Sequence, residues 1–281
     1  MKKSSFIMLF FSLIAITFQY SAMGQTLPSS GNEEIMSIHN KYLKAVNLDE
    51  GKILSKNNLN KFLQLALNDN WYSQINFWVS AQWGVKEYEG LVAKQYELNG
   101  KNLTSPVTDR RPKKVEEGNI YGIRYDGSND FCENADVKAE QPLSILLVFK
   151  ADKNNGENVL MDTKGNRNCQ ISIDNSKDGE SQLVIRSAGE VRVKGLRDGV
   201  NIVYVEFDLK NSKVFINGDL VYNNPIGKSE INGIKLGEGK INDSFKYFKG
   251  VMYETGIINN LINDQARTDL FGMMKDIYQI K

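Results

Sequence analysis

The stretch YGIRYDGSNDF at 121–131 carries much of the fold information, together with KVFINGDLV at 213–221 and YFKGVMYETGIIN at 247–259. Each stretch contains a short run rich in β-branched and aromatic residues, which is typical of a strand. Asn217 and Gly218 separate two apolar runs, and this dipeptide favours the positive φ angles of a tight hairpin. The three stretches therefore predict two strands and a hairpin.

In this order the stretches resemble the laminin-G-like branch of the concanavalin A-like lectin/glucanase jelly rolls. That family repeats an opening FDGxxDY strand, a central xLYVNGxLV hairpin and a closing FxGxIDEVRIYN strand. Arg111-Pro112 also matches an RP that the family often carries before the first strand. The resemblance covers about 92–281 and implies a mainly β, two-sheet antiparallel jelly-roll sandwich.

The remaining pattern places helices at both ends of the chain. Apolar residues recur at helical spacing over 32–46 and 59–67, and after an interruption again over 71–82. Trp83-Gly84 resembles the end of the helical segment that precedes the first strand in bacterial secreted proteins of this type. Near the C-terminus, Asn263 or Asp264 is expected to cap a last helix. We therefore expect three segments: a signal peptide at 1–24, a helical segment at 25–84 and the jelly roll with its C-terminal helix at 85–281.

Between about 92 and the 250s the chain reads as short strands separated by Gly, Asn and Asp turns. Eleven such strands favour a two-sheet β-sandwich. The run at 143–149 has almost no polar alternation, which predicts a central strand covered on both faces.

The first residues form a targeting signal. Lys2 and Lys3 precede an apolar run at 6–18, and small residues Ala22 and Gly24 lie before an expected cut at Gln25. An uncleaved N-terminal anchor is the alternative, but the run is short for a membrane span of roughly 20 residues. The signal predicts a secreted, periplasmic or cell-surface protein with no membrane span after cleavage.

The charge and cysteine counts narrow the range of partners. Lys plus Arg number 35 against 34 Asp plus Glu, so no basic stripe suits nucleic acid. Cys132 and Cys169 could form one disulfide in an oxidising compartment. Cys169 shares its side of a strand with Ile171 and Ile173, and this pattern equally suits a buried thiol.

Catalytic signatures are sparse. His39 is the only histidine, and it lies in the first predicted helix without a nucleophile motif. The glucanases of the resembled fold carry ExDxE or ExDxxE, whose period-two spacing aims the carboxyls at one face. Glu206 and Asp208 begin this pattern, but Lys210 and Asn211 stand where the last Glu is required. The sequence therefore favours a protein without catalytic activity.

Sugar binding requires less than sugar cleavage, because aromatic rings stack on sugars and polar groups fix the hydroxyls. The candidate carbohydrate-binding residues are Tyr204, Glu206, Asp208 and Tyr253. Core packing accounts for most of the other aromatic residues. The resemblance also allows one calcium ion, for which the candidate ligands, otherwise turn formers, are Asp126, Asp130, Asp162 and Asp243.

We therefore expect a secreted, non-catalytic recognition protein that binds carbohydrate or an extracellular protein through the jelly roll. Two alternatives stay open. One is a polysaccharide-degrading enzyme, either a glycoside hydrolase or a lyase, that uses an unrecognised set of carboxylate, Tyr or Lys residues. The other is a structural or adhesive surface subunit whose helices pack against a partner.

Overall fold

The computed structural model describes residues 29–153, 156–163, 169–175, 180–228 and 230–280. The expected signal peptide at 1–24 lies outside this part of the chain. Among the described residues, no helix is both long and apolar enough to cross a membrane.

Within the described residues, three α-helices form where the sequence predicts helical spacing and caps. The Ser55 side chain accepts a hydrogen bond from the Asn58 amide at the start of the second helix, and Asn263 accepts one from the Ala266 amide at the start of the third. The helical elements are α1 (Ser29–Leu48), α2 (Lys56–Asn68), α3 (Asp264–Tyr278) and the 3₁₀ turns η1 (Tyr72–Gln74) and η2 (Thr108–Arg110).

Antiparallel strands make up most of the rest of the described chain. In order they are β1 (Lys52–Ile53), β2 (Ile75–Ser80), β3 (Gly84–Tyr88), β4 (Leu91–Gln95), β5 (Leu103–Thr104), β6 (Lys113–Glu117), β7 (Ile120–Asp126), β8 (Cys132–Glu140), β9 (Leu143–Ala151), β10 (Gly156–Thr163), β11 (Gln170–Asn175), β12 (Ser181–Arg186), β13 (Glu190–Val193), β14 (Val200–Phe207), β15 (Lys213–Ile216), β16 (Asp219–Asn223), β17 (Glu230–Leu236), β18 (Glu238–Ile241), β19 (Ser244–Tyr247) and β20 (Lys249–Asn259).

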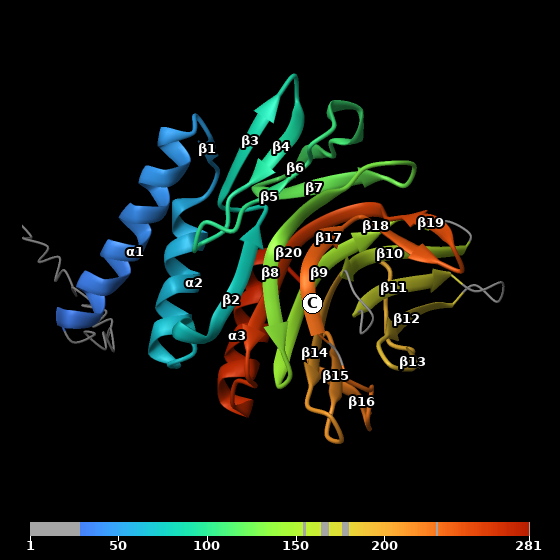
Figure 1. Ribbon diagram of the computed structural model, residues 1–281. Helices are drawn as coiled ribbons and strands as arrows, with labels where there is room; N and C mark the ends of the chain where they lie inside the picture. The colour runs from blue at the N-terminus through green and yellow to red at the C-terminus, as the bar shows by residue number, and fades with distance from the viewer. Residues whose placement is uncertain (1–28, 154–155, 164–168, 176–179, 229, 281) are drawn as a thin grey trace, which may run out of the picture.

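The described strands pair into one continuous 18-stranded sheet, and β18 and β19 form a separate hairpin. Hydrogen-bonded neighbours run from β16 through β15, β14, β9 and β20, then through β7, β6, β4, β5 and β8, and on through β17 and β10 to β13. The sheet thus curls into a nearly closed, barrel-like shell (Figure 1). The expected jelly roll of two separate sheets is not confirmed, because β4 to β8 join the two halves by hydrogen bonds.

Two hydrophobic cores lie on opposite sides of the part of this sheet formed by β9, β14 and β20. The inner core fills the shell, with Leu147 of β9 on one wall and Leu183 of β12 on the other. The outer core lies between the helices and the outer surface of β9, β14 and β20, where Leu146 and Tyr204 belong to it. Strand β9 therefore contributes alternate residues to both cores, which confirms the prediction for 143–149.

The segment from Trp71 to Gln82 is not helical as predicted. After η1 it forms β2, which pairs with β20 along Ile75–Ser80. The helical spacing of its apolar residues was misleading because β2 is buried on nearly every side. A strand covered on both faces loses its period-two pattern. The hairpin at Asn217 and Gly218 does form, and both residues have positive φ angles of 56° and 100°.

Candidate functional site

The outer surface of β9, β14 and β20, which we call the helix-covered face, holds three of the four predicted sugar-binding residues. Tyr204 and Glu206 lie on β14 and Tyr253 lies on β20. All three are nearly inaccessible, with exposures of 0%, 1% and 4%.

Helix α3 is what covers them. The Tyr204 ring meets the Phe271 ring edge to face at 6.2 Å between centroids, and the Tyr253 ring lies 5.0 Å from that of Tyr278. The Arg267 guanidinium donates a 2.7 Å hydrogen bond to Glu206. Sugar binding by these residues stays a prediction, and it requires α3 to leave the sheet.

Asp208 lies just beyond β14, apart from this cluster. Its amide donates a hydrogen bond to Ser212 in the turn that leads to β15. The structure therefore brings Tyr204 and Glu206 together beneath α3 and leaves Asp208 in a turn.

The cysteines are buried in the inner core, and three of the calcium candidates lie in turns. No disulfide joins Cys132 and Cys169, and both lie buried in the inner core. Asp126 accepts hydrogen bonds from the Ser128 and Asn129 amides, and Asp130 accepts one from the Asp126 amide. These are turn contacts. Asp243 lies in the β18–β19 turn with a positive φ of 61°. Within the described part of the chain, no three metal-ligating side chains gather.

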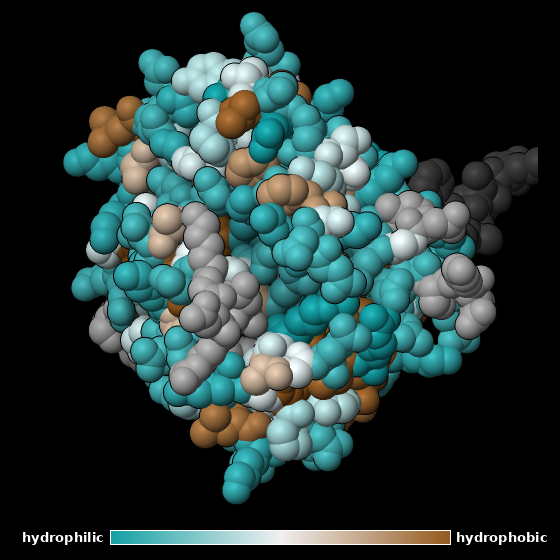
Figure 2. Space-filling view, turned by 45° about the vertical axis from the view of Figure 1, so that its right-hand side comes forward, coloured by the Kyte–Doolittle hydropathy of each residue, from teal (hydrophilic) through white to brown (hydrophobic). Residues whose placement is uncertain are grey.

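The opposite half of the sheet presents a polar outer surface, which we call the polar face. It belongs to β8, β17 and β10 to β13, and no helix packs on it within the described chain (Figure 1). Figure 2 looks toward this side of the molecule and shows a mainly hydrophilic surface with scattered apolar spots.

A row of polar side chains crosses the polar face at right angles to the strands. Cross-strand partners share a face of the sheet, so the strand registers place these residues side by side. Lys235 pairs with Glu133 on one side and Asp162 on the other, and Arg186 pairs with Gln170 and Glu190. This charged row consists of Glu133, Lys235, Asp162, Gln170, Arg186 and Glu190.

Ion pairs and hydrogen bonds connect neighbouring members of the row. Lys235 lies 3.7 Å from a Glu133 oxygen. The Gln170 amide nitrogen donates to Asp162 at 3.2 Å, and the Gln170 oxygen accepts from Arg186 at 3.2 Å. Arg186 also lies 2.9 Å from Glu190. Charges of opposite sign thus alternate across the sheet.

Two carboxylates of β10 have contrasting surroundings on this face. Glu157 is ion-paired with Arg186 and accepts a 2.6 Å hydrogen bond from the Ser172 hydroxyl. Burial raises the pKa of Asp162, although Gln170 and two backbone amides donate to it. A carboxyl with a raised pKa beside an ion-paired one is the arrangement that separates acid and base roles.

Side chains of β11 contact both members of this pair. Glu157 bonds to Ser172 and Asp162 bonds to Gln170, which is the next residue on the same face of that strand. The strand register sets Glu157 opposite Asp174. Arg186 contacts both Glu157 and the Gln170 oxygen, and the Gln170 amide donates to Asp162. The polar face therefore brings two carboxylates with different surroundings into one hydrogen-bonded network.

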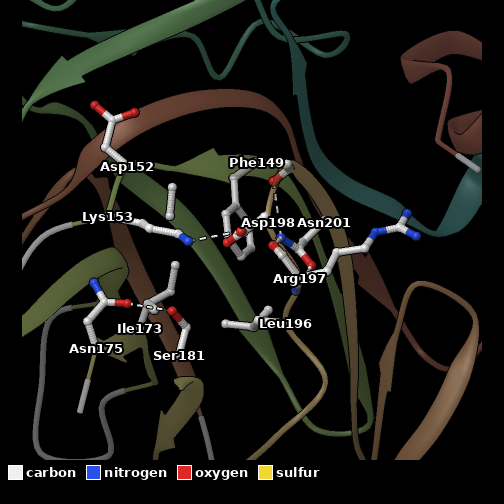
Figure 3. A pocket seen from close by; sticks show the side chains of 12 residues that line it. Phe149, Asp152, Lys153, Ile173, Asn175, Ser181, Leu196, Arg197, Asp198 and Asn201 are labelled. Carbon is white, nitrogen blue, oxygen red and sulfur yellow. Dashed lines mark hydrogen bonds and ion pairs between the residues drawn. The ribbon is translucent and has the colours of Figure 1, made fainter. Parts of the chain in front are cut away.

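A hollow opens at the end of the inner core, between β9, β11 and the loop before β14 (Figure 3). Its volume is about 140 Å³, and Phe149 lines it. Lys153 and Asp198 form a 2.9 Å ion pair there, while Asp152 points away and pairs with Arg124. The hollow has room for one small ring, but the described residues that line it place no two carboxylates face to face.

No protein-family model matches the chain, and no curated protein sequence matches it. Solved structures share its fold. Trypanosoma rangeli sialidase in complex with sialic acid aligns with 73% of this chain and 34% of its own at a TM-score of 0.53 and 10% identity. The same sialidase as a covalent intermediate with 2,3-difluorosialic acid aligns with 79% of this chain and 40% of its own at 0.54 and 9%.

A mutant GH54 α-L-arabinofuranosidase soaked with 4-nitrophenyl α-L-arabinofuranoside gives a TM-score of 0.53 at 12% identity. The alignment covers 67% of this chain and 51% of that one. The chain thus spans about a third to a half of the length of these proteins. At such low identity the likeness concerns the fold alone.

These findings correct two expectations from the sequence. The laminin-G-like assignment is wrong, because no family model matches and the similar structures are a sialidase and an arabinofuranosidase. The expectation of a non-catalytic recognition protein is corrected by the same neighbours, which are carbohydrate-active enzymes.

The charged row was missed at the sequence level. Asp162 was considered only as a turn former or calcium ligand, and β8 and β17 were not predicted. The available signal was in β11, where polar Gln170, Ser172 and Asp174 alternate with apolar Ile171 and Ile173. That alternation predicts a polar outer face, but it does not identify the neighbouring strands.

Proposed function

We propose that this chain is a carbohydrate-active domain that hydrolyses glycosidic bonds on its polar face. The observation that carries the proposal is the pair formed by Asp162 and Glu157, held by consecutive same-face residues of β11. Two further points support it. The fold is shared with a sialidase and an arabinofuranosidase, and no helix among the described residues covers this face.

The two carboxyls have different roles in hydrolysis, one as the acid and the other as the base. Asp162, whose pKa burial raises, donates its proton to the leaving glycosidic oxygen as the C–O bond breaks. Glu157 removes a proton from the water that forms the new C–O bond. Arg186 is a positioning residue, since it holds Glu157 and the Gln170 side chain together.

The test is release of reducing sugar from a panel of polysaccharides. Asp162→Asn and Glu157→Gln are each expected to lower kcat by about 100-fold or more, which is the usual contribution of one acid or base. Asp219→Asn is the matched control, because Asp219 is an exposed carboxylate on β16, in the other half of the sheet. We expect that control to keep its activity within about twofold.

Two outcomes would contradict the proposal. One is that the wild-type protein releases no sugar from any member of the panel. The other is that both variants, shown to be folded by circular dichroism, keep wild-type rates.

We also propose that the protein works outside the cytoplasm, as the N-terminal targeting pattern suggests. Polysaccharide substrates are extracellular or periplasmic materials for such a protein. N-terminal sequencing of the protein recovered from its native compartment tests this, and an intact N-terminus on cytoplasmic protein would oppose it.

A further inference from the structure

The hairpin of β18 and β19 presents two aromatic rings. Lys240 pairs with Phe245 and Glu238 pairs with Tyr247, so these four side chains share one face of the hairpin. The turn between the strands is tight, with positive φ angles at Asn242 and Asp243.

The two rings lie nearly parallel. The angle between the Phe245 and Tyr247 planes is 23°, and their centroids are 6.4 Å apart. Phe245 is 53% exposed and Tyr247 is partly exposed. The Lys240 ammonium lies 5.0 Å from the Phe245 centroid. A single exposed apolar side chain is ordinary, but two neighbouring, nearly parallel rings form an aromatic surface.

This aromatic surface is fixed to the candidate catalytic groups. The Lys240 amide donates to Asp162 at 3.3 Å, and the Lys240 carbonyl accepts from Gln170 at 3.0 Å. At the other end of β18, Glu238 forms a 2.7 Å ion pair with Lys235. The hairpin is therefore attached to the charged row at three of the row's side chains.

Glycine permits this close approach. A Cβ atom on Gly239 would lie 2.6 Å from an Asp162 carboxylate oxygen and 2.8 Å from Val159. Any other residue at this position would push the hairpin away from β10. The glycine at position 239 thus allows the hairpin to contact the charged row.

We propose that Phe245 and Tyr247 form a stacking subsite that holds a sugar unit of a neutral polysaccharide on the β18–β19 hairpin. Aromatic rings offer the apolar surface on which a sugar ring rests, and nearby polar groups bind its hydroxyls. Here Lys240 and Asp243 supply such groups at the rim. The inference rests on the proposed function for its ligand class, but it concerns binding and not hydrolysis.

The experiment measures binding separately from cleavage. Affinity electrophoresis with soluble neutral polysaccharides is run on the wild type, Asp162→Asn, Phe245→Ala and Tyr247→Ala. The matched control is Tyr88→Ala, since Tyr88 is another exposed aromatic residue at 50% exposure, on β3. We expect Phe245→Ala and Tyr247→Ala each to bind at least about tenfold more weakly, and Tyr88→Ala to bind as the wild type does.

The inference and the proposed function fail in different ways. Binding that is lost in Phe245→Ala, without any hydrolysis by the wild type, supports the subsite and removes the enzymatic proposal. Unchanged binding in both Phe245→Ala and Tyr247→Ala overturns the subsite, whatever the rate of hydrolysis. Absence of binding by the wild type to every polysaccharide tested also overturns it.

Discussion

The two outer surfaces of the curled sheet carry similar carboxylate–arginine pairs in different surroundings. On the helix-covered face, Glu206 is sealed beneath α3 with Arg267 and is only 1% exposed. On the polar face, Glu157 and Arg186 form a comparable pair whose side chains are 13% and 23% exposed. The chemistry of the pair is the same, and the difference lies in what covers it. A covering helix turns a carboxylate into a structural group, whereas an uncovered face leaves it within reach of a ligand.

The largest difference between the faces should appear on removing a buried ring. Trp78 of β2 is fully buried against Phe62, at 4.5 Å between ring centroids, and its indole nitrogen donates to Glu254. Trp78→Ala is expected to lower the free energy of unfolding by about 3–5 kcal/mol. Urea denaturation measures this. Gln182→Ala on the polar face is the control, with an expected change within about 0.5 kcal/mol.

A matched pair of arginine variants compares the two ion pairs directly. Arg267→Ala leaves Glu206 buried with only Lys213 nearby, at 3.8 Å, and should cost about 3 kcal/mol. Arg186→Ala removes a partly exposed pair and should cost about 1 kcal/mol. Denaturation midpoints of both variants check the difference. Equal losses would mean that coverage by α3 does not distinguish the faces.

A smaller, pH-dependent effect comes from Glu254, which is buried beneath α3. It accepts hydrogen bonds from Trp78, Ser80 and Tyr278, all neutral donors. Burial raises its pKa from 4.5 to about 7. Because the folded protein binds this proton more tightly, the stability is greatest below about pH 4.5 and declines as the pH rises to about 7.

The corresponding variant is Glu254→Gln, which stays neutral at every pH. Between pH 5 and pH 8, the wild type should lose about 2 kcal/mol of stability relative to the variant. Chemical denaturation of both proteins at the two pH values measures this difference. Parallel pH profiles would show that Glu254 does not titrate in this range.

Local pattern predicted a good share of the fold. The uninterrupted apolar run at 143–149 predicted a strand covered on both faces, and β9 does contribute to both cores. Asn263 predicted the start of α3, and Asn217 with Gly218 predicted a hairpin. In each case the signal is contained within a few adjacent residues, so the surrounding structure could not override it.

Prediction failed where a residue's role depends on distant neighbours. The helical spacing around Trp78 proved to belong to a strand, because β20 pairs with it from the other end of the chain. Tyr204 and Tyr253 were expected to meet sugars, but α3 folds over them. Asp162 was treated as a turn former because nothing nearby in sequence indicates Lys235 or Lys240 beside it.

The sequence by itself determined a mainly β chain with helices at both ends, near-neutral charge and aromatic residues spread along its length. Periodicity and turn chemistry act over a few residues, so they can be read directly from it. Only the tertiary structure decided which face of the sheet is covered and which carboxylates lie side by side. Those outcomes depend on pairing between strands that lie far apart in the chain, such as β10 with β17, and on where α3 docks.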